Sequence, residues 1–317
     1  MIRAPLPASV GGHWTGLVCE TDGPARPGLR VEVTGGRRLL LRQGDRVVLL
    51  GVQRAMHRGV YYARTGRYRS PLPPISAAEA RRVRETSVDD DAWSARWTHQ
   101  FTDLLQAVGD GPMYAGRWTL AWGMPSWSVA AHWHRLPAVD PDQGHITWFG
   151  YGDPVEDQRD ILPLRRLSPH GAARVRSYRR QVREGVLPPA LLWWVSGLDI
   201  LLVLDGHDRI AAALAEHTVP AVVVLAPAPG PTWAAGADRH IVREYEGRLQ
   251  ALQPAANHGD ELAKANIANI TRRFAGQLND VARSEGRTRA WPLPGGRAAW
   301  QQQAAQLAPD WTIGPAG

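Results

Sequence analysis

The sequence has almost no cysteine and almost no lysine, and both shortages narrow what the protein can be. Cys19 is the single cysteine among 317 residues, so the chain cannot form an internal disulfide bond. Lys264 is the single lysine, so arginine supplies nearly all of the basic charge. No segment reaches the roughly 18 consecutive apolar residues that a membrane-spanning helix needs. The first residues also lack the apolar run of a signal peptide, so we expect a cytoplasmic protein.

The basic charge of the chain has two explanations. A formal charge of +7 and an isoelectric point near 10.1 suit a protein that binds nucleic acid. A composition rich in arginine, alanine, glycine and proline is also typical of a GC-rich genome, which would explain part of the charge without a ligand. Tryptophan is common and phenylalanine rare, at 14 and 3 copies, and tryptophan fills cores more often than it lines clefts.

Residues 1 to 155 are predicted to form a strand-rich region of mixed structure, for which we find no family resemblance. Glycine pairs and alternating apolar residues favour strands and hairpins in its first half. Residues 75–85 and 89–105 read as helices, and the acidic run Asp89 to Asp91 is typical of a helix start. The expected strands cover residues 29–34, 37–42, 46–51, 59–63, 116–123, 126–136 and 145–151.

The segment from Leu198 to Val224 is the most informative part of the chain. It reads as a buried strand, the polar turn Asp205-Gly206-His207-Asp208-Arg209, a short alanine-rich helix and a second buried strand. Unpaired N–H groups and a positive dipole at the start of that helix can hold a phosphate. Upstream, Ser168-Pro169 predicts the start of another helix, with Ser168 as its N-cap. A β-hairpin is expected between that helix and the turn.

Residues 160–226 resemble the ParB/sulfiredoxin-like fold in the order of their parts. The order is a short strand, a helix, Pro-Pro, a hairpin, a Gly-x-x-Arg turn, a helix and a strand. The residues that carry the resemblance are Leu162-Pro163-Leu164, Val175, Pro188-Pro189, the turn from Asp205 to Arg209, Ala211-Ala212 and Val219-Pro220-Ala221. Members of that family bind CTP and DNA, repair an oxidised cysteine with ATP, phosphorylate serine or act as nucleases. The resemblance implies a nucleotide or phosphate at the turn.

Differences from the family narrow the expected chemistry. Sulfiredoxins carry Gly-Cys-His-Arg at the turn, and His207 stands here in place of the cysteine nucleophile. ParB proteins carry Gly-Glu-Arg-Arg with a separate Glu-Asn-x-x-Arg motif and a helix-turn-helix, and neither partner motif is found. Sulfiredoxin chemistry and a clamp-type CTPase are therefore both disfavoured, and the turn looks closer to serine-kinase-like and uncharacterised branches.

Each residue of the turn has a functional and a structural interpretation. Gly206 would let the backbone approach an anion, or simply permit a sharp turn. Arg209 would clamp phosphate, or pair with Asp205 or Asp208. His207 would donate to phosphate or transfer a proton, or bond the backbone. Asp205 and Asp208 repel a bare anion, so they predict Mg²⁺ with the phosphate or a base for a substrate hydroxyl. N-capping is the structural alternative for both aspartates.

The helix before Pro188 adds candidate nucleotide-binding residues. Arg174, Ser177 and Gln181 fall on one helical face. In sulfiredoxin-like proteins this face contacts ATP with a basic residue and hydroxyls, which Arg174 and Ser177 match and Gln181 does not. An arginine run around the same unit would track nucleic acid or form a solvated face, and we favour the latter. The run comprises Arg165, Arg166, Arg174, Arg176, Arg179, Arg180 and Arg183.

A second cluster of possible ligands precedes the central unit. His132 and His134 would share one side of a strand, and Asp140, Asp142 and His145 follow closely. These residue types bind metals, but their spacing matches no known site, so a metal there is the weaker hypothesis.

The sequence predicts an α+β protein with three parts. Residues 156–228 form a ParB/sulfiredoxin-like domain, between the strand-rich region 1–155 and a helical region 229–317. We expect it to bind a nucleotide, ATP with Mg²⁺ first, and to carry out phosphoryl transfer to a small hydroxyl compound or hydrolysis. Asp205, His207 and Asp208 are the catalytic candidates, Gly206, Arg209, Arg174 and Ser177 the nucleotide ligands, and Asp205 and Asp208 the metal ligands. A nucleic-acid-binding or nuclease protein and a non-catalytic scaffold are the alternatives.

Overall fold

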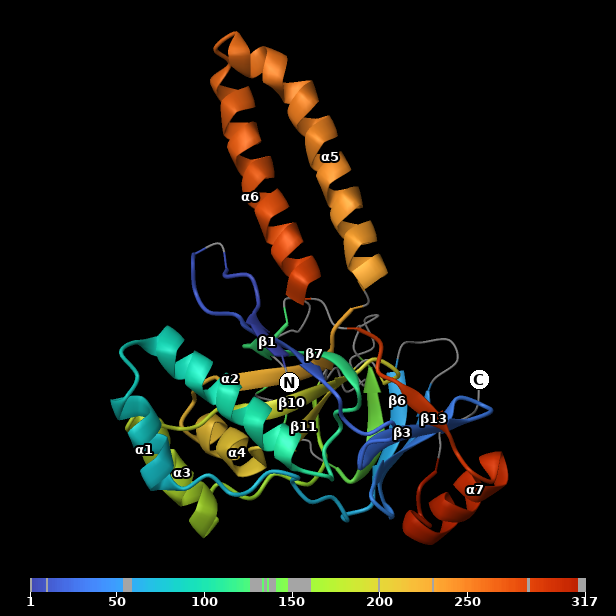
Figure 1. Ribbon diagram of the computed structural model, residues 1–317. Helices are drawn as coiled ribbons and strands as arrows, with labels where there is room; N and C mark the ends of the chain where they lie inside the picture. The colour runs from blue at the N-terminus through green and yellow to red at the C-terminus, as the bar shows by residue number, and fades with distance from the viewer. Residues whose placement is uncertain are drawn as a thin grey trace.

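The computed structural model shows an α+β protein built on two β-sheets, with a long helical hairpin that projects from them (Figure 1). The structure describes residues 2–9, 11–53, 59–125, 133, 136, 141–147, 161–198, 200–229, 231–283 and 286–312. The boundary expected at residue 155 lies outside this set, and so does the strand expected over residues 126–136 except for Trp133 and Leu136, which form a turn in which the Leu136 N–H donates to the Trp133 carbonyl at 3.2 Å. Among the described residues, no helix is long and apolar enough to cross a membrane.

The six-stranded sheet follows the meander that the glycine turns predict. Its order is β13-β3-β4-β5-β6-β8, and the pairs from β3 to β6 are antiparallel neighbours in the chain. The hairpin predicted at Gly35-Gly36 joins β3 to β4, and Gly36 has a φ of 72°. The strands are β3 (Leu29–Thr34), β4 (Arg38–Gln43), β5 (Arg46–Gln53), β6 (Gly59–Arg64), β8 (Gln143–Thr147) and β13 (Ala290–Pro292).

The seven-stranded sheet carries the candidate turn. Its order is β1-β2-β7-β12-β10-β11-β9, and it mixes antiparallel pairs with the parallel pairs β10–β12 and β11–β9. The strands are β1 (Ile2–Pro5), β2 (Gly16–Thr21), β7 (Gly116–Trp122), β9 (Ile161–Pro163), β10 (Ala190–Val195), β11 (Ile200–Asp205) and β12 (Val222–Pro227). The hairpin β10–β11 is confirmed. Because β7 pairs with β12, the N-terminal and central regions share one sheet.

Side chains on alternate positions of β10 enter two different cores, as the two-residue period of a strand requires. Leu191, Trp193 and Val195 join the main core, which also contains residues of the six-stranded sheet. Leu192 and Trp194 face a second core beneath α4 (His207–Ala215). Both faces of this sheet are therefore buried, which explains its nearly uninterrupted apolar strands.

Two helices of the N-terminal region start where the sequence indicates. α1 (Ala77–Glu85) is capped by Ser76, whose Oγ accepts from the Glu79 N–H at 3.1 Å. α2 (Asp90–Ala107) is capped by Asp89, whose carboxylate accepts from the Ala92 N–H at 2.7 Å. Helical spacing predicts that Trp93, Trp97, Phe101 and Leu104 share one face of α2, and Trp97 and Phe101 are buried in the main core.

The start predicted for the next helix is wrong. α3 (Ala173–Arg183) begins four residues after Pro169, and its N-cap is Ala172, which provides no side-chain cap. Ser168 instead donates from its Oγ to Oδ1 of Asp208 at 2.7 Å. The side chain thus satisfies a buried carboxylate 40 residues away rather than the end of a helix. Helical spacing predicts that Val175, Tyr178 and Val182 share one face of α3, and the structure buries Val175 and Tyr178 against α4.

The C-terminal region is largely helical, as expected. α5 (Pro231–Asn257) and α6 (Glu261–Arg283) form the projecting antiparallel hairpin (Figure 1). Helical spacing predicts an apolar stripe on α6 that includes Ile267, Ile270 and Phe274, and Phe274 stacks on Tyr245 of α5 with ring centroids 4.2 Å apart. After β13, α7 (Gly296–Leu307) covers the six-stranded sheet, and the Trp300 Nε1 donates to the Leu39 carbonyl at 2.8 Å.

Candidate functional site

The turn between β11 and α4 depends on a glycine for two reasons. Gly206 has a φ of +89°, a left-handed conformation that side chains with a Cβ disfavour. A Cβ at this position would also lie 2.9 Å from the Ala190 Cα and from the Arg209 Nε. Close packing of the turn on β10 therefore requires the glycine, as the structural interpretation of Gly206 supposed. An approach of a ligand to this backbone stays a prediction.

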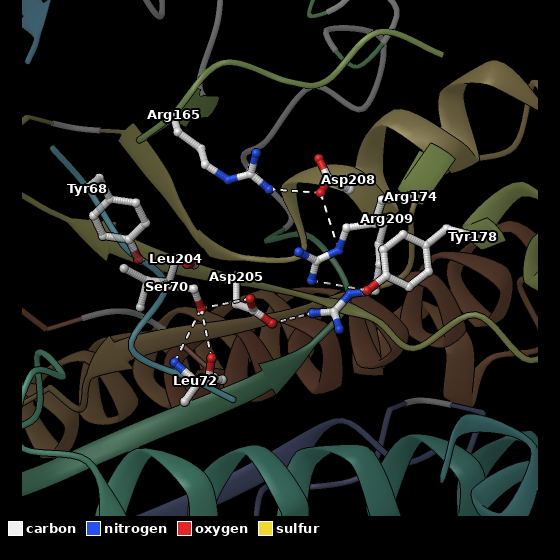
Figure 2. Close-up of polar contacts among 10 residues, drawn as sticks. All are labelled: Tyr68, Ser70, Leu72, Arg165, Arg174, Tyr178, Leu204, Asp205, Asp208 and Arg209. Carbon is white, nitrogen blue, oxygen red and sulfur yellow. Dashed lines mark hydrogen bonds and ion pairs between the residues drawn. The ribbon is translucent and has the colours of Figure 1, made fainter. Parts of the chain in front are cut away.

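Asp205 ends β11 and is held from two sides. Its Oδ1 accepts from the Ser70 Oγ at 2.7 Å, and its Oδ2 accepts from Arg209 Nη2 at 2.5 Å (Figure 2). The Asp205 side chain is 17% exposed and that of Arg209 only 4%. The pairing of Arg209 with Asp205 is the structural alternative that the sequence left open. The ion pair with Arg209 holds the Asp205 carboxylate in place, and the carboxylate remains in partial contact with solvent.

Asp208, in the first turn of α4, is held by three side chains from two other segments. Ser168 donates to its Oδ1 at 2.7 Å. The guanidinium of Arg165 lies 3.0 Å from its Oδ2, and Nε of Arg174 lies 3.5 Å from the same atom (Figure 2). The Asp208 side chain is 6% exposed, whereas those of Arg165 and Arg174 are 37% and 58% exposed. The two arginines thus contact the buried carboxylate at one end and are exposed to solvent elsewhere.

Arg209 is buried with part of its hydrogen-bonding capacity unused. The residue is 3% exposed, and its Nε has no hydrogen-bond partner among the described residues. A buried donor without a partner costs about 1–3 kcal/mol. The site therefore contains a polar group that a ligand or a water molecule would stabilise.

His207 is buried and neutral. It is 2% exposed, and its Nε2 accepts from the Arg165 backbone N–H at 3.4 Å. Burial lowers the pKa of His207 well below its usual value, and the charges of Arg165, Arg64 and Arg209 lower it further. Because Nε2 is the acceptor, the ring proton resides on Nδ1. This hydrogen bond to the backbone is the structural interpretation of His207. A catalytic role for His207 stays a prediction.

The predicted nucleotide-binding face of α3 is divided between solvent and core. Arg174 contacts Asp208 and lies over the Tyr178 ring, with the guanidinium carbon 5.8 Å from the centroid. Ser177 is exposed, and its hydroxyl has no hydrogen bond to another described residue. Gln181 is 3% exposed, and its Oε1 has no partner among the described side chains and backbone. The structure therefore brings Arg174 to the turn, and leaves Ser177 beside it on the surface.

The N-terminal region contributes residues that the sequence did not indicate. Besides Ser70, Tyr68 reaches the turn, and its hydroxyl donates to the Leu204 carbonyl at 2.6 Å (Figure 2). The Tyr68 ring lies against His207 with centroids 6.0 Å apart. Burial and the charge of Asp205 raise the Tyr68 pKa well above its ordinary value, so the hydroxyl stays protonated. Only the turn-rich segment RYRSPLPP hinted at these contacts, by marking a loop with polar side chains.

The second predicted cluster is only partly within the described structure. His132, His134 and Asp140 lie outside the described residues. Asp142 pairs with Arg64 at 3.1 Å and with Arg166 at 2.9 Å, and the His145 ring lies against Tyr61 with centroids 5.8 Å apart. Within the ranges that the structure describes, no three His, Cys, Asp or Glu side chains lie together as metal ligands would.

Comparisons with known proteins add no relative. No family model, no curated protein and no solved structure matches this chain. The functional interpretation therefore depends on the residues at the turn and their geometry.

Proposed function

We propose that this protein binds a nucleotide, ATP with Mg²⁺ as the first candidate, and that the phosphates lie at the turn between β11 and α4. One observation carries the proposal: three guanidinium groups meet two carboxylates and a neutral histidine at the start of a helix. The local charge is positive, and the α4 dipole adds to it. A helix start that combines these features favours a phosphate group.

Exposure distinguishes the arginines that would touch the ligand from the one that organises the site. Arg165 and Arg174 reach solvent, at 37% and 58% exposure of their side chains, so they would bind the phosphates. Arg209 is buried and pairs with Asp205. We therefore propose that Arg209 positions this carboxylate, in addition to any contact that it makes with the ligand. Ser177 lies on the same exposed face as Arg174 and would bind another part of the nucleotide.

The residues of the turn suit a metal ion that binds to both the protein and the ligand. They suit a metal ion bound by protein side chains alone less well. Mg²⁺ usually binds one or two carboxylates together with substrate phosphates and water. Asp205 and Asp208 supply such oxygens, although serine and arginine partners contact both in the absence of a ligand. Bound with the nucleotide, Mg²⁺ would neutralise charge on the phosphates.

Phosphoryl transfer to a small hydroxyl compound, or hydrolysis, is the reaction that we infer for such a site. Asp205 is the better base, because its side chain is more exposed than that of Asp208. It already accepts a hydrogen bond from the hydroxyl of Ser70 at 2.7 Å, which is the contact that a substrate hydroxyl would make. The resemblance of residues 160–226 to nucleotide-binding ParB/sulfiredoxin-like domains supports the same ligand, and we expect the cytoplasm as the location.

Thermal unfolding with added nucleotides tests the proposal. ATP, CTP, GTP and ADP would each be added with and without Mg²⁺, to the wild type and to Arg209→Ala. A ligand at 100 times its dissociation constant stabilises the folded state by about 2.7 kcal/mol, which a melting curve resolves easily. We expect this shift for a nucleoside triphosphate with Mg²⁺ and its loss in the variant. No shift with any nucleotide would contradict the proposal, and an equal shift in the variant would move the site elsewhere.

Nucleic-acid binding has less support from the geometry. Six of the seven arginines in the run have an acidic partner, and Arg176 donates to the Gly171 carbonyl. A surface that neutralises its own arginines attracts a polyanion less strongly. Salt-sensitive DNA binding without a nucleotide effect would nevertheless favour this function, and failure to bind either ligand would favour the scaffold.

A further inference from the structure

A pocket with a volume of about 630 Å³ lies along α4, outside the Asp205–Arg209 turn. None of the residues assigned above to the nucleotide lines it. Its described lining combines an apolar floor with a basic rim. The apolar residues are Leu136, Leu167, Pro169, Ala211, Leu214 and Ala215. The polar ones are Arg166, Ser168, His170 and Arg179.

Small side chains on α4 create the hollow. Ala211, Leu214 and Ala215 are spaced by three and four residues, so they lie on one face of the helix. The two alanines end at Cβ and leave room for a flat apolar group between the helix and the loop that carries Leu167. The volume is within the range of pockets that enclose small molecules, about 300–1,000 Å³.

The guanidinium groups at the rim of the pocket are held in position by ion pairs with acidic side chains. Nε of Arg179 donates to Glu216 at 2.6 Å, and the Arg179 side chain remains 31% exposed. Its two terminal nitrogens have no hydrogen bond to any described residue, so the outer edge of the fork can bind another anion. Arg166 is likewise paired with an acid, Asp142, at 2.9 Å. A guanidinium held in this way suits a carboxylate or phosphate, which it can bind through two parallel hydrogen bonds.

We infer that this pocket is a second ligand site, which takes an organic acid with an apolar ring or chain. The apolar part lies on Ala211, Leu214 and Ala215, and the carboxylate or phosphate group meets Arg179. Ser168 lines the pocket and also donates to Asp208 at 2.7 Å, so the bound acid lies one side chain away from the turn. The inference does not depend on nucleotide binding at the turn.

Calorimetric titration of the full chain with 2-naphthoate, without nucleotide, tests this site. We expect saturable binding, and weaker binding of the neutral analogue 2-naphthylmethanol. Arg179→Gln should weaken 2-naphthoate binding about tenfold, the size of one lost charge-assisted hydrogen bond. Glu216 keeps Arg183 as a partner at 3.6 Å in this variant, so no carboxylate is left unpaired.

Arg180→Gln is the matched control, because this residue lies on the same helix, is 64% exposed and does not line the pocket. Its affinity should equal that of the wild type. Ala215→Leu should fill the hollow and remove binding, and its circular dichroism and melting curve establish whether it is folded. If Ala215→Leu does not fold, the two arginine variants decide the question. Absence of saturable binding, or equal affinity in Arg179→Gln and Arg180→Gln, would overturn the inference.

Discussion

Within the part of the chain that the structure describes, two clusters pair three arginines with carboxylates, and they differ in how exposed the carboxylates are. In the six-stranded sheet, Glu32 accepts from Arg26, Arg30 and Arg42 at 2.5, 2.7 and 2.9 Å, and its side chain is 1% exposed. Burial would raise the Glu32 pKa, but the hydrogen bonds from the three arginines outweigh it and lower the pKa. All four residues come from one short stretch of chain. The carboxylate of this cluster is closed to solvent, although the Arg26 side chain is 45% exposed, and we interpret the cluster as structural.

The cluster at the turn uses the same chemistry in an open arrangement. Its arginines serve two carboxylates, two serines assist them, and its members come from four separate segments. Two of its arginines extend into solvent, and it lies at the start of α4, where the dipole favours an anion. The comparison teaches that convergence of arginines does not by itself make a site. The exposure of the carboxylate, 17% for Asp205 against 1% for Glu32, and the position at a helix start distinguish the ligand-binding candidate from the structural cluster.

Removing the carboxylate of the closed cluster should have the largest effect on stability. Glu32→Gln leaves three arginines without their counter-charge, which should lower the free energy of unfolding by about 3 kcal/mol. Urea denaturation measures this change. Nucleotide binding by the folded variant should be unchanged, because Glu32 does not contact the turn. A loss below about 1 kcal/mol would show that Glu32 is not a structural centre.

Crowding the turn should have the next largest effect. Gly206→Ala places a Cβ 2.9 Å from the Ala190 Cα at a φ of +89°, so we expect a loss of about 2–3 kcal/mol in unfolding free energy. Gly66→Ala is the control, because Gly66 has a φ of +71° with no atom within 4 Å of the added Cβ. The control should lose only about 1 kcal/mol. Equal losses would mean that packing against β10 is unimportant.

Acidification should destabilise the turn through His207. Its pKa is lower in the folded protein than in the unfolded chain, so the unfolded chain binds the proton first. Stability is therefore complete above the unfolded pKa near 6.5 and falls below it, by about 1.4 kcal/mol per pH unit. His207→Gln should remove this part of the slope between pH 7 and 5.5. Identical slopes for the two proteins in urea titrations would contradict a buried neutral histidine.

Cutting the link from the N-terminal region to the turn should have the smallest effect on stability. Ser70→Ala removes the hydrogen bond to Asp205 and should cost about 1 kcal/mol. Ser76→Ala costs a similar amount, because it removes the N-cap of α1. Only Ser70→Ala should also weaken nucleotide binding, measured by calorimetry. Equal nucleotide affinity in both variants would limit Ser70 to a structural role.

Local patterns predicted most of the strands, the helix over residues 75–85, the helix start at Asp89, and the turn at Gly206. These features depend on alternation, capping and glycine conformation within a few residues. Partners distant in the sequence were not predictable in this way. Ser70 and Asp205 are 135 positions apart, and Ser168, which looked like a helix cap, instead bonds Asp208.

The same limit applies to the division of the chain. Composition suggested three successive parts, yet β7 pairs with β12 and β13 pairs with β3. Pairing of strands across such distances depends on how the whole core packs, which no local pattern records. In the candidate site, the sequence indicates the turn residues and Arg174, but it does not indicate Tyr68, Ser70 or the specific role of Arg165.

The most direct measurement is the affinity for Mg-ATP of two matched arginine variants on α3. Arg174 reaches Asp208, whereas Arg176, on the same helix and also exposed, donates to the Gly171 carbonyl. If the open cluster binds phosphate, Arg174→Gln should weaken binding about tenfold while Arg176→Gln matches the wild type. Equal affinities in the two variants, or no binding by the wild type, would contradict nucleotide binding at this turn.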